Sequence, residues 1–344
     1  MPDRIDASFD GVRNAPALAE LCADLLARQR ESWPALRDGY AALDDARIRE
    51  IAADGYSVKL QFNPRRMVSS GAAVDPESIR RRKCFLCSEN LPKEQMRILY
   101  RGAYLILCNP APIFPRHFTV ASRRHLPQAI ESDLAVFLTL AEDFGPGWSV
   151  FYNGPGCGAS APDHLHFQAA PAGIMPVENE IGEEINRIPV GRVGEAAVLA
   201  SNGLGRPLII VEGSGQKGVM SALRTVVAAL RNGPTSPDEP MMNVLCSHNG
   251  AQWRVLLFPR RRHRPEAYYR DGDDRVLISP GAVDMAGLII TVVEKDFHAV
   301  GAEQVERIFR EVSMDGARFD GLVSALPDRL RQQAGAEAAA SEAG

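Results

Sequence analysis

The spacing of hydrophobic and polar residues predicts many short strands and fewer helices. From residue 15 to 52, hydrophobic residues recur every three or four positions, which is typical of a helix. Residues 56–62 alternate between polar and hydrophobic, as a half-buried strand does. Further strands are predicted at 104–108, 117–121, 148–152, 164–169, 207–211, 242–246, 253–258 and 286–293. Further helices are predicted at 126–144, 219–230, 302–312 and 321–332.

The order of these elements predicts an α+β protein built on an antiparallel sheet with flanking helices. Strands precede and follow one helix in residues 56–176, and residues 177–333 repeat this order loosely. We therefore expect a duplicated sheet whose second half is degenerate. In this division residues 1–55 form an N-terminal helical extension, and the low-complexity residues 334–344 form a disordered tail.

The composition gives no sign of nucleic-acid or membrane binding. The 344 residues carry a formal net charge of -4, so no broad basic surface would attract either partner. No hydrophobic stretch approaches the ~20 residues of a membrane helix, and the N-terminus is acidic where a signal peptide is basic. We expect a cytoplasmic protein. Its six cysteines are irregularly spaced, which argues against a disulfide framework.

The sequence His164-Leu-His166-Phe-Gln168 is the strongest candidate for chemistry. In a strand, residues two apart point to one face, so both histidines and Gln168 would line one surface. A lone histidine is more often a core or surface residue, but this pair with Gln168 indicates a site. The glycine-rich loop 153–160 precedes it, and such loops bind phosphate through backbone N–H groups, although hairpin turns use the same residues.

Cys84 and Cys87 have the C-x-x-C spacing of a metal chelate or a redox pair. A tetrahedral zinc site needs two more ligands, for which His125 and His164 are the best candidates. A redox dithiol is the second possibility, although the strand and helix of a thioredoxin-like site are not evident here. Two unligated buried thiols are the third, because cysteine is a common core residue.

Three stretches carry a family resemblance. They are Asn109 to Val120 with its Asn-x-x-Pro-x-x-Pro-x-His pattern, Asn153 to Gln168, and the cysteine and histidine set just named. Together they resemble the histidine-triad and galactose-1-phosphate uridylyltransferase superfamily, in the branch whose strand has His-x-His-x-Gln. Residues 257–259, 278–287 and 311–313 resemble, more weakly, the far half of GDP-hexose phosphorylases and of diadenosine tetraphosphate phosphorylases.

The resemblance implies a histidine-triad-like sheet and a nucleotidyltransferase of the phosphorylase type. Its nucleophile would be His166, which would form a covalent nucleotidyl-histidine, while Gln168 and Ser160 would contact the transferred phosphoryl group. The residues expected to bind substrate are Asn153, Gly158, Ala159, Asn109, His117 and Arg65. A structural Zn²⁺ ion would be held by Cys84, Cys87, His125 and His164.

The expected reaction is the phosphorolysis of a nucleotide sugar to a nucleoside diphosphate and a hexose 1-phosphate. The expected partners are therefore a nucleotide or nucleotide sugar and inorganic phosphate, with no nucleic acid and no membrane, in a monomer or homodimer. Alternatives are a diadenosine polyphosphate phosphorylase, a uridylyl- or adenylyltransferase, a nucleotide hydrolase, and a nucleotide-binding protein without activity. One departure from the family is Ala161-Pro162-Asp163, which is one residue longer than the usual spacing between Ser160 and His164.

Overall fold

One large sheet organises the molecule. The computed structural model describes residues 4–12, 17–71, 73–182, 187–231 and 239–342, and within them this sheet has eleven strands. In spatial order they are β1 (Ile5–Phe9), β4 (Arg97–Tyr100), β5 (Tyr104–Cys108), β6 (Phe118–Ser122), β8 (His166–Pro171), β7 (Trp148–Asn153), β12 (Met242–His248), β13 (Trp253–Pro259), β11 (Leu208–Gly213), β10 (Ala196–Ser201) and β9 (Ile188–Val193). Neighbouring strands are antiparallel except β1 and β4, which are parallel.

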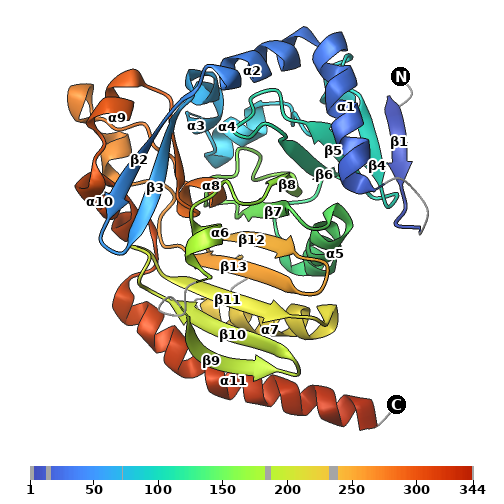
Figure 1. Ribbon diagram of the computed structural model, residues 1–344, viewed down its shortest axis with the longest axis vertical. Coiled ribbons are helices and arrows are strands. Elements are labelled where there is room, and N and C mark those ends of the chain that lie inside the picture. Colours follow the sequence, from blue (N-terminus) through green and yellow to red (C-terminus); the bar gives the residue numbers. More distant parts are fainter. Residues whose placement is uncertain (1–3, 13–16, 72, 183–186, 232–238, 343–344) are drawn as a thin grey trace.

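One face of this sheet is covered by helices. Side chains alternate along each strand, so Val150 and Tyr152 of β7 point to the helical face while Phe151 points to the other. The covering helices are α1 (Leu18–Ser32), α2 (Pro34–Asp44), α5 (Leu134–Phe144), α7 (Gln216–Leu230) and α11 (Gly316–Glu342). Figure 1 shows the strands stacked from β1 to β9, with α1, α5 and α7 along one side.

The opposite face is covered by a smaller sheet and short helices. The small sheet has the order β14 (Leu288–Thr291), β3 (Tyr56–Phe62) and β2 (Arg47–Ala53). With α8 (Ala282–Met285), α9 (Glu294–Ala299) and α10 (Ala302–Val312) it packs mainly on β7, β12, β13 and β11. Over β5, β6 and β8 the cover is instead irregular chain, and this is where the cavity described below lies.

The remaining described elements are short. They are α3 (Met67–Ser70), α4 (Pro76–Arg81), α6 (Val177–Glu180) and the 3₁₀ turns η1 (Pro64–Arg66), η2 (Ser88–Asn90), η3 (Glu131–Asp133), η5 (Glu266–Tyr269) and η6 (Gly272–Asp274). Among the described residues, no helix combines the length and the apolar character that a bilayer crossing requires.

Both halves of the large sheet have the same topology. In the first half the chain order β4, β5, β6, α5, β7, β8 gives the spatial order β4-β5-β6-β8-β7. In the second half, β9, β10, β11, α7, β12, β13 gives β9-β10-β11-β13-β12. The halves meet where β7 pairs with β12. The predicted α+β class with an antiparallel sheet is therefore confirmed, while a common origin of the halves remains a prediction.

The structure differs from the expected elements in several places. Strands β1, β4, β9 and β10 were not predicted, and β1 lies within residues 1–55, which were expected to be helical. The helical pattern of residues 15–52 ends in a strand, β2, because this segment pairs along its whole length with β3. The helix expected from 126 begins only at Leu134, since the carbonyl of Leu126 accepts the N–H of Leu165. The strand expected from 164 begins at His166. Residues 334–342, expected as a disordered tail, continue helix α11.

Candidate active site

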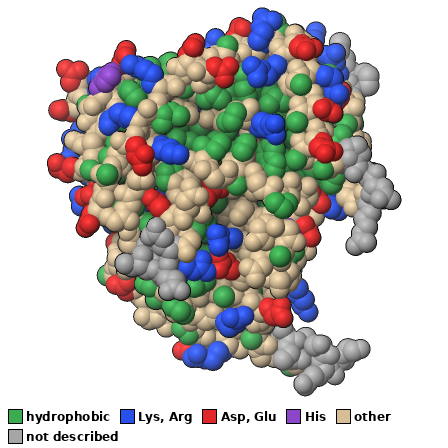
Figure 2. Space-filling view, in the orientation of Figure 1, with side chains coloured by type: hydrophobic (Ala, Val, Ile, Leu, Met, Phe, Trp, Pro, Cys, Tyr) green, Lys and Arg blue, Asp and Glu red, His purple; other side chains and the backbone are tan. Residues whose placement is uncertain are grey.

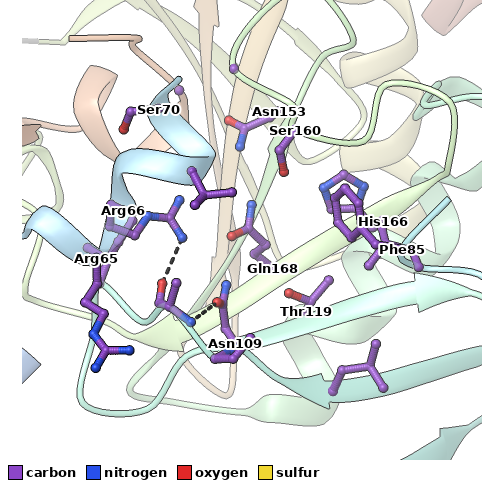
Figure 3. A pocket seen from close by; sticks show the side chains of 18 of the residues that line it. Arg65, Arg66, Ser70, Phe85, Asn109, Thr119, Asn153, Ser160, His166 and Gln168 are labelled. Carbon is purple, nitrogen blue, oxygen red and sulfur yellow. Dashed lines mark hydrogen bonds between the residues drawn. The ribbon is translucent and has the colours of Figure 1, made fainter. Parts of the chain in front are cut away.

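A cavity of about 810 Å³ lies against the irregularly covered part of the large sheet. Of the predicted site residues, those that line it are His166, Gln168, Ser160, Asn153, Gly158, Asn109 and Arg65. Ala159 and His117 are buried and do not line it. Figure 3 shows His166, Ser160, Asn153 and Gln168 directed toward the same space. The strand and the loop singled out in the sequence therefore meet at one cavity.

The ring of His166 is held in one orientation by the chain beside it. Its Nδ1 lies 2.8 Å from the carbonyl oxygen of His164, and a carbonyl can only accept, so Nδ1 carries the proton and donates it. The other nitrogen, Nε2, is then unprotonated. Burial lowers the pKa of His166 to about 4, so the ring is neutral near pH 7. This neutral nitrogen has the lone pair that a nucleophile needs.

Gln168 is oriented by His117, which lies behind it. The Nδ1 of His117 accepts the N–H of Ile113 at 3.2 Å, so its Nε2 carries the proton and donates to Gln168 Oε1 at 3.0 Å. Burial lowers the pKa of His117 to about 3, with a further contribution from the charge of Arg66, so this ring is neutral too. Because its oxygen is occupied, Gln168 can present its amide N–H groups to the cavity. His117 therefore positions a residue that lines the cavity.

Gly158 is required by a close contact with the second half of the chain. Its φ of +93° is rarely adopted by other residues, and an added Cβ would lie 2.7 Å from the Cα of Gly281. Nearby, Asn153 Oδ1 accepts the backbone N–H of Ala282 at 2.7 Å and an amide N–H of Asn243 at 2.9 Å. The loop that carries Ser160 is thus packed against the segment around Gly281.

The segment Ala161-Pro162-Asp163 of this loop is held by an ion pair. Asp163 accepts a hydrogen bond from Arg82 at 2.5 Å, and the other Asp163 oxygen lies 3.9 Å from Nε2 of His125. Arg82 also lies 3.5 Å from the carbonyl oxygen of Ser160 and 5.1 Å from the centre of the Phe85 ring. Arg82 and Phe85 both line the cavity. The loop is therefore tied to the cavity wall through Asp163, and Ser160 lines the cavity.

The cavity has a cationic region and an apolar region. At the cationic region Arg66 donates to the carbonyl of Ala111 at 2.8 Å, and Figure 3 shows Arg65 directed away from His166. Burial lowers the pKa of Arg66 to about 10 and raises that of Asp284 to about 6. Apolar lining residues are Trp33, Val68, Phe85, Leu86, Leu91 and Leu107. Figure 2 shows hydrophobic side chains gathered where Figure 1 places α3, α4 and β5.

Several lining residues were not predicted from the sequence. They are Arg82, Phe85, Thr119 and Asp284. Arg82 lies in a basic run that also fits a solvated surface, and Phe85 stands between the two predicted metal ligands. Thr119 alternates with hydrophobic residues of β6, which is a detectable signal, whereas nothing in the sequence around Asp284 indicates a cavity.

The four predicted metal ligands form one cluster at the end of the cavity wall. The ligand atoms of Cys84, Cys87, His125 and His164 all lie within 4.8 Å of one another. Nδ1 of His164 is 3.2 Å from Cys84 Sγ, and Nδ1 of His125 is 3.2 Å from Cys87 Sγ. His164 Nε2 donates to the carbonyl of Ser122 at 2.7 Å, which leaves Nδ1 free to bind a metal. Two sulfurs and two nitrogens at these separations fit a tetrahedral ion.

Two family models match the chain. Residues 25–171 match the model described as "Domain of unknown function (DUF4922)", and residues 208–332 match "GDPGP1-like, C-terminal domain". No curated protein matches the sequence significantly.

Solved structures of yeast Ap4A phosphorylase Apa2 are similar to this chain. The free protein has a TM-score of 0.52, the AMP complex 0.53 and the Ap4A complex 0.51, each at 15% identity. These alignments cover 82%, 85% and 82% of this chain and 94%, 97% and 97% of the yeast chains. This chain therefore has the fold of Apa2. With the GDPGP1-like match, this confirms the predicted resemblance to phosphorylases of this superfamily, and it supports the predicted enzyme class, a nucleotidyltransferase.

Proposed function

We propose that this chain, which has the Apa2 fold and a GDPGP1-like C-terminal domain, transfers a nucleotidyl group from a nucleotide sugar to inorganic phosphate. The observation that carries the proposal is the state of His166. Its Nδ1 proton is donated to a backbone carbonyl, its ring is neutral, and it lines a large cavity beside the amide of Gln168. A neutral imidazole held in this way is suited to attack phosphorus.

In the proposed first step, Nε2 of His166 attacks the α-phosphorus of the nucleotide sugar. A phosphorus–nitrogen bond forms, the bond to the bridging oxygen breaks, and hexose 1-phosphate leaves with its electron pair as an anion. In the second step an oxygen of inorganic phosphate attacks the same phosphorus and the phosphorus–nitrogen bond breaks. Nucleoside diphosphate leaves and His166 is neutral again. Neither leaving group needs a proton from the protein.

Other residues would stabilise the charge that develops on the phosphoryl oxygens. The amide N–H groups of Gln168 can donate to these oxygens, because its carbonyl oxygen already accepts from His117. Ser160 and the cation of Arg66 line the same cavity. Such chemistry depends chiefly on positioning and on charge stabilisation, which is what these fixed donors supply.

We assign the metal cluster to zinc. Two thiolates and two imidazoles are the ligands of closed structural zinc sites, and no position would remain for a catalytic water. The ion would hold the segment of Cys84 and Cys87 against His164, whose carbonyl orients the ring of His166. Its role would be structural.

The two regions of the cavity suit the two ends of a nucleotide sugar. The exposed ring of Phe85, with Arg82 beside it, offers a surface on which a nucleobase can stack. Arg66 and the residues near Asp284 offer charge and hydrogen bonds for the acceptor phosphate and the sugar. The segment 279–284 lies within the GDPGP1-like match, which favours a nucleotide sugar as the donor.

The test is a panel of nucleoside diphosphate hexoses, incubated with and without inorganic phosphate and followed by product identity. We expect a nucleoside diphosphate and a hexose 1-phosphate only when phosphate is present. Equal rates without phosphate, with a nucleoside monophosphate as product, would show a hydrolase and reject the phosphorylase. Ap4A belongs in the same panel because the fold match to Apa2 favours it as the second candidate donor. If Ap4A were turned over and no nucleotide sugar were, the assignment of a nucleotide sugar as the donor would be rejected.

A further inference from the structure

Strands β7 and β8 separate just before they reach His166. They pair in register from Trp148 with Pro171 to Phe151 with Gln168. Two further steps in this register would place Asn153 opposite His166. The backbone N–H and C=O of His166 point toward this side, because the carbonyl of the preceding residue, Leu165, points to the other side and accepts the N–H of Ser122 in β6. The nucleophile would thus have an unpaired backbone here, if nothing else filled the gap.

The side chain of Gln128 fills this gap. Its Oε1 accepts the N–H of His166 at 2.8 Å. Its Nε2 donates to the carbonyl of His166 at 3.0 Å and to the carbonyl of Asn153 at 2.9 Å. Gln128 is only 1% exposed, and the residue comes from the segment before α5, in neither strand. One side-chain amide therefore does what the peptide group of Asn153 would do in a continuous ladder.

The backbone around Gln128 strengthens this arrangement. Its own N–H donates to the carbonyl of Pro162 at 3.2 Å, and the carbonyl of Leu126 accepts the N–H of Leu165 at 2.7 Å. The segment 126–128 therefore binds both the end of the loop between β7 and β8 and the residue just before β8. Asn153 is not paired with β8, and its side chain accepts hydrogen bonds from Asn243 and from the backbone N–H of Ala282 in the second half of the chain.

We propose that Gln128 is the positioning residue of the nucleophile, and that its amide keeps His166 at the point where the sheet opens into the cavity. This inference rests on the proposed role of His166. Gln128 is not among the residues that line the cavity, so it would act through His166 and not by contact with a substrate. It acts by fixing the backbone from which the imidazole projects, and displacements of about 1 Å at a reacting atom can cost about 100-fold in rate.

The first variant is Gln128→Met, which has nearly the same size but no hydrogen-bonding groups. It leaves the N–H and C=O of His166 and the C=O of Asn153 buried without this partner. We expect the rate of covalent labelling of His166 by a radiolabelled nucleotide sugar to fall about 100-fold, while KM changes by less than about threefold. The matched control is Gln29→Met, another buried glutamine, whose amide donates to the carbonyl of Glu94 in a different part of the chain. It should lower thermal stability without lowering the labelling rate.

The second variant, Gln128→Glu, separates positioning from folding. The ionised carboxylate of this variant can still accept the N–H of His166 but cannot donate to the carbonyls. The protonated carboxyl regains one donor. Burial raises the pKa of the introduced carboxyl group. The labelling rate of this variant relative to wild type should rise as the pH is lowered from about 8 to about 5.5. A purely structural role predicts a ratio that does not depend on pH. Labelling of Gln128→Met at the wild-type rate would overturn the role of Gln128 and leave the proposed function standing, and so would a pH-independent ratio for Gln128→Glu. If the wild-type protein itself were not labelled, the proposed function would be overturned as well.

Discussion

At the scale of single residues, the site depends on which nitrogen of each histidine is protonated. The backbone decides this in all three cases. His166 donates from Nδ1 to a carbonyl, His164 donates from Nε2 to a carbonyl, and His117 accepts a backbone N–H at Nδ1. The remaining nitrogens are thereby assigned to the cavity, to the metal cluster and to Gln168. Three similar rings obtain three different roles from the peptide groups next to them.

Replacing His166 by glycine should abolish nucleotidyl transfer. The variant has no nitrogen to attack phosphorus, so we expect turnover to fall at least about 1,000-fold and covalent labelling to disappear. The measurement is the incorporation of labelled nucleotide into denatured protein. His298→Gly is a suitable control, since His298 is an exposed residue of α9 that lies 3.7 Å from Glu294. Labelling of the His166→Gly protein at the wild-type level would exclude this nucleophile.

The labelling rate should depend on pH through His166. Burial lowers its pKa to about 4, and only the neutral ring has a free lone pair at Nε2. The rate should therefore be constant above about pH 5 and fall as the pH drops through about 4. Single-turnover labelling across this range, with circular dichroism to confirm folding, would measure it. A midpoint near the ordinary histidine value of about 6.5 would contradict this account of the site.

At the scale of elements, the loop between β7 and β8 is held at several points. It packs on the second half at Gly158, and its Asp163 is paired with Arg82. At its C-terminal end His164 turns away from the strand and joins the two cysteines. The loop therefore links the metal cluster, the cavity and the second half of the chain.

Gly158→Ala should disrupt this loop more than Gly156→Ala. The added methyl group would require an unfavourable φ and would lie 2.7 Å from the backbone of Gly281. We expect a loss of about 1–3 kcal/mol in the free energy of unfolding and a loss of at least about tenfold in kcat. At Gly156 the nearest atom is the flexible end of Met241 at 3.4 Å, so that variant should behave nearly as wild type. Denaturant unfolding and steady-state kinetics compare them, and equal effects would contradict the packing argument.

Removal of the metal should lower both stability and activity. The cluster joins Cys84 and Cys87 to the segment that orients His166, so Cys84→Ser or a strong chelator should reduce the melting temperature. Elemental analysis of the purified protein should find one zinc per chain. A metal-free protein with unchanged melting temperature and activity would remove the zinc assignment.

The sequence predicts the regular elements better than the cavity. Alternation predicts β3, an unbroken apolar run predicts β5, and the helical period predicts α10, with the bounds they have. β3 and α10 have one buried and one less buried face, which leaves a periodic signal, whereas β5 is buried throughout. Gln128 and Asp284 occupy irregular or very short segments, and their roles depend on contacts distant in the sequence. No local pattern records such contacts, so these residues could be identified only from the structure.

At the scale of the whole molecule, the cavity is shared by the two halves of the chain. His166 and Gln168 come from the first half, whereas Gly281 and Asp284 come from the second. The buried guanidinium of Arg260 donates to the carbonyls of Pro280, Val312, Arg262 and His263 and to Asn243, so it holds this second wall together. Neither half contains a complete site.

Residues 1–182 expressed alone should therefore give no covalent labelling. This fragment lacks Asn243 and Ala282, which bond to Asn153, and it exposes the edge of β7 that normally pairs with β12. We expect an aggregation-prone protein whose labelling is restored, at least in part, by co-expression with residues 187–344. Labelling of the isolated fragment at the wild-type rate would show that the second half is dispensable.

The pairing of β7 with β12 has a consequence for how such a protein can change over time. Two units of the same topology meet there as the subunits of a symmetric dimer would, but they are encoded in one chain. In a homodimer every substitution appears twice, so a change that suits one subunit must also be tolerated by the other. Here each unit can vary independently. The first can retain its histidines while the second supplies a different wall of the same cavity.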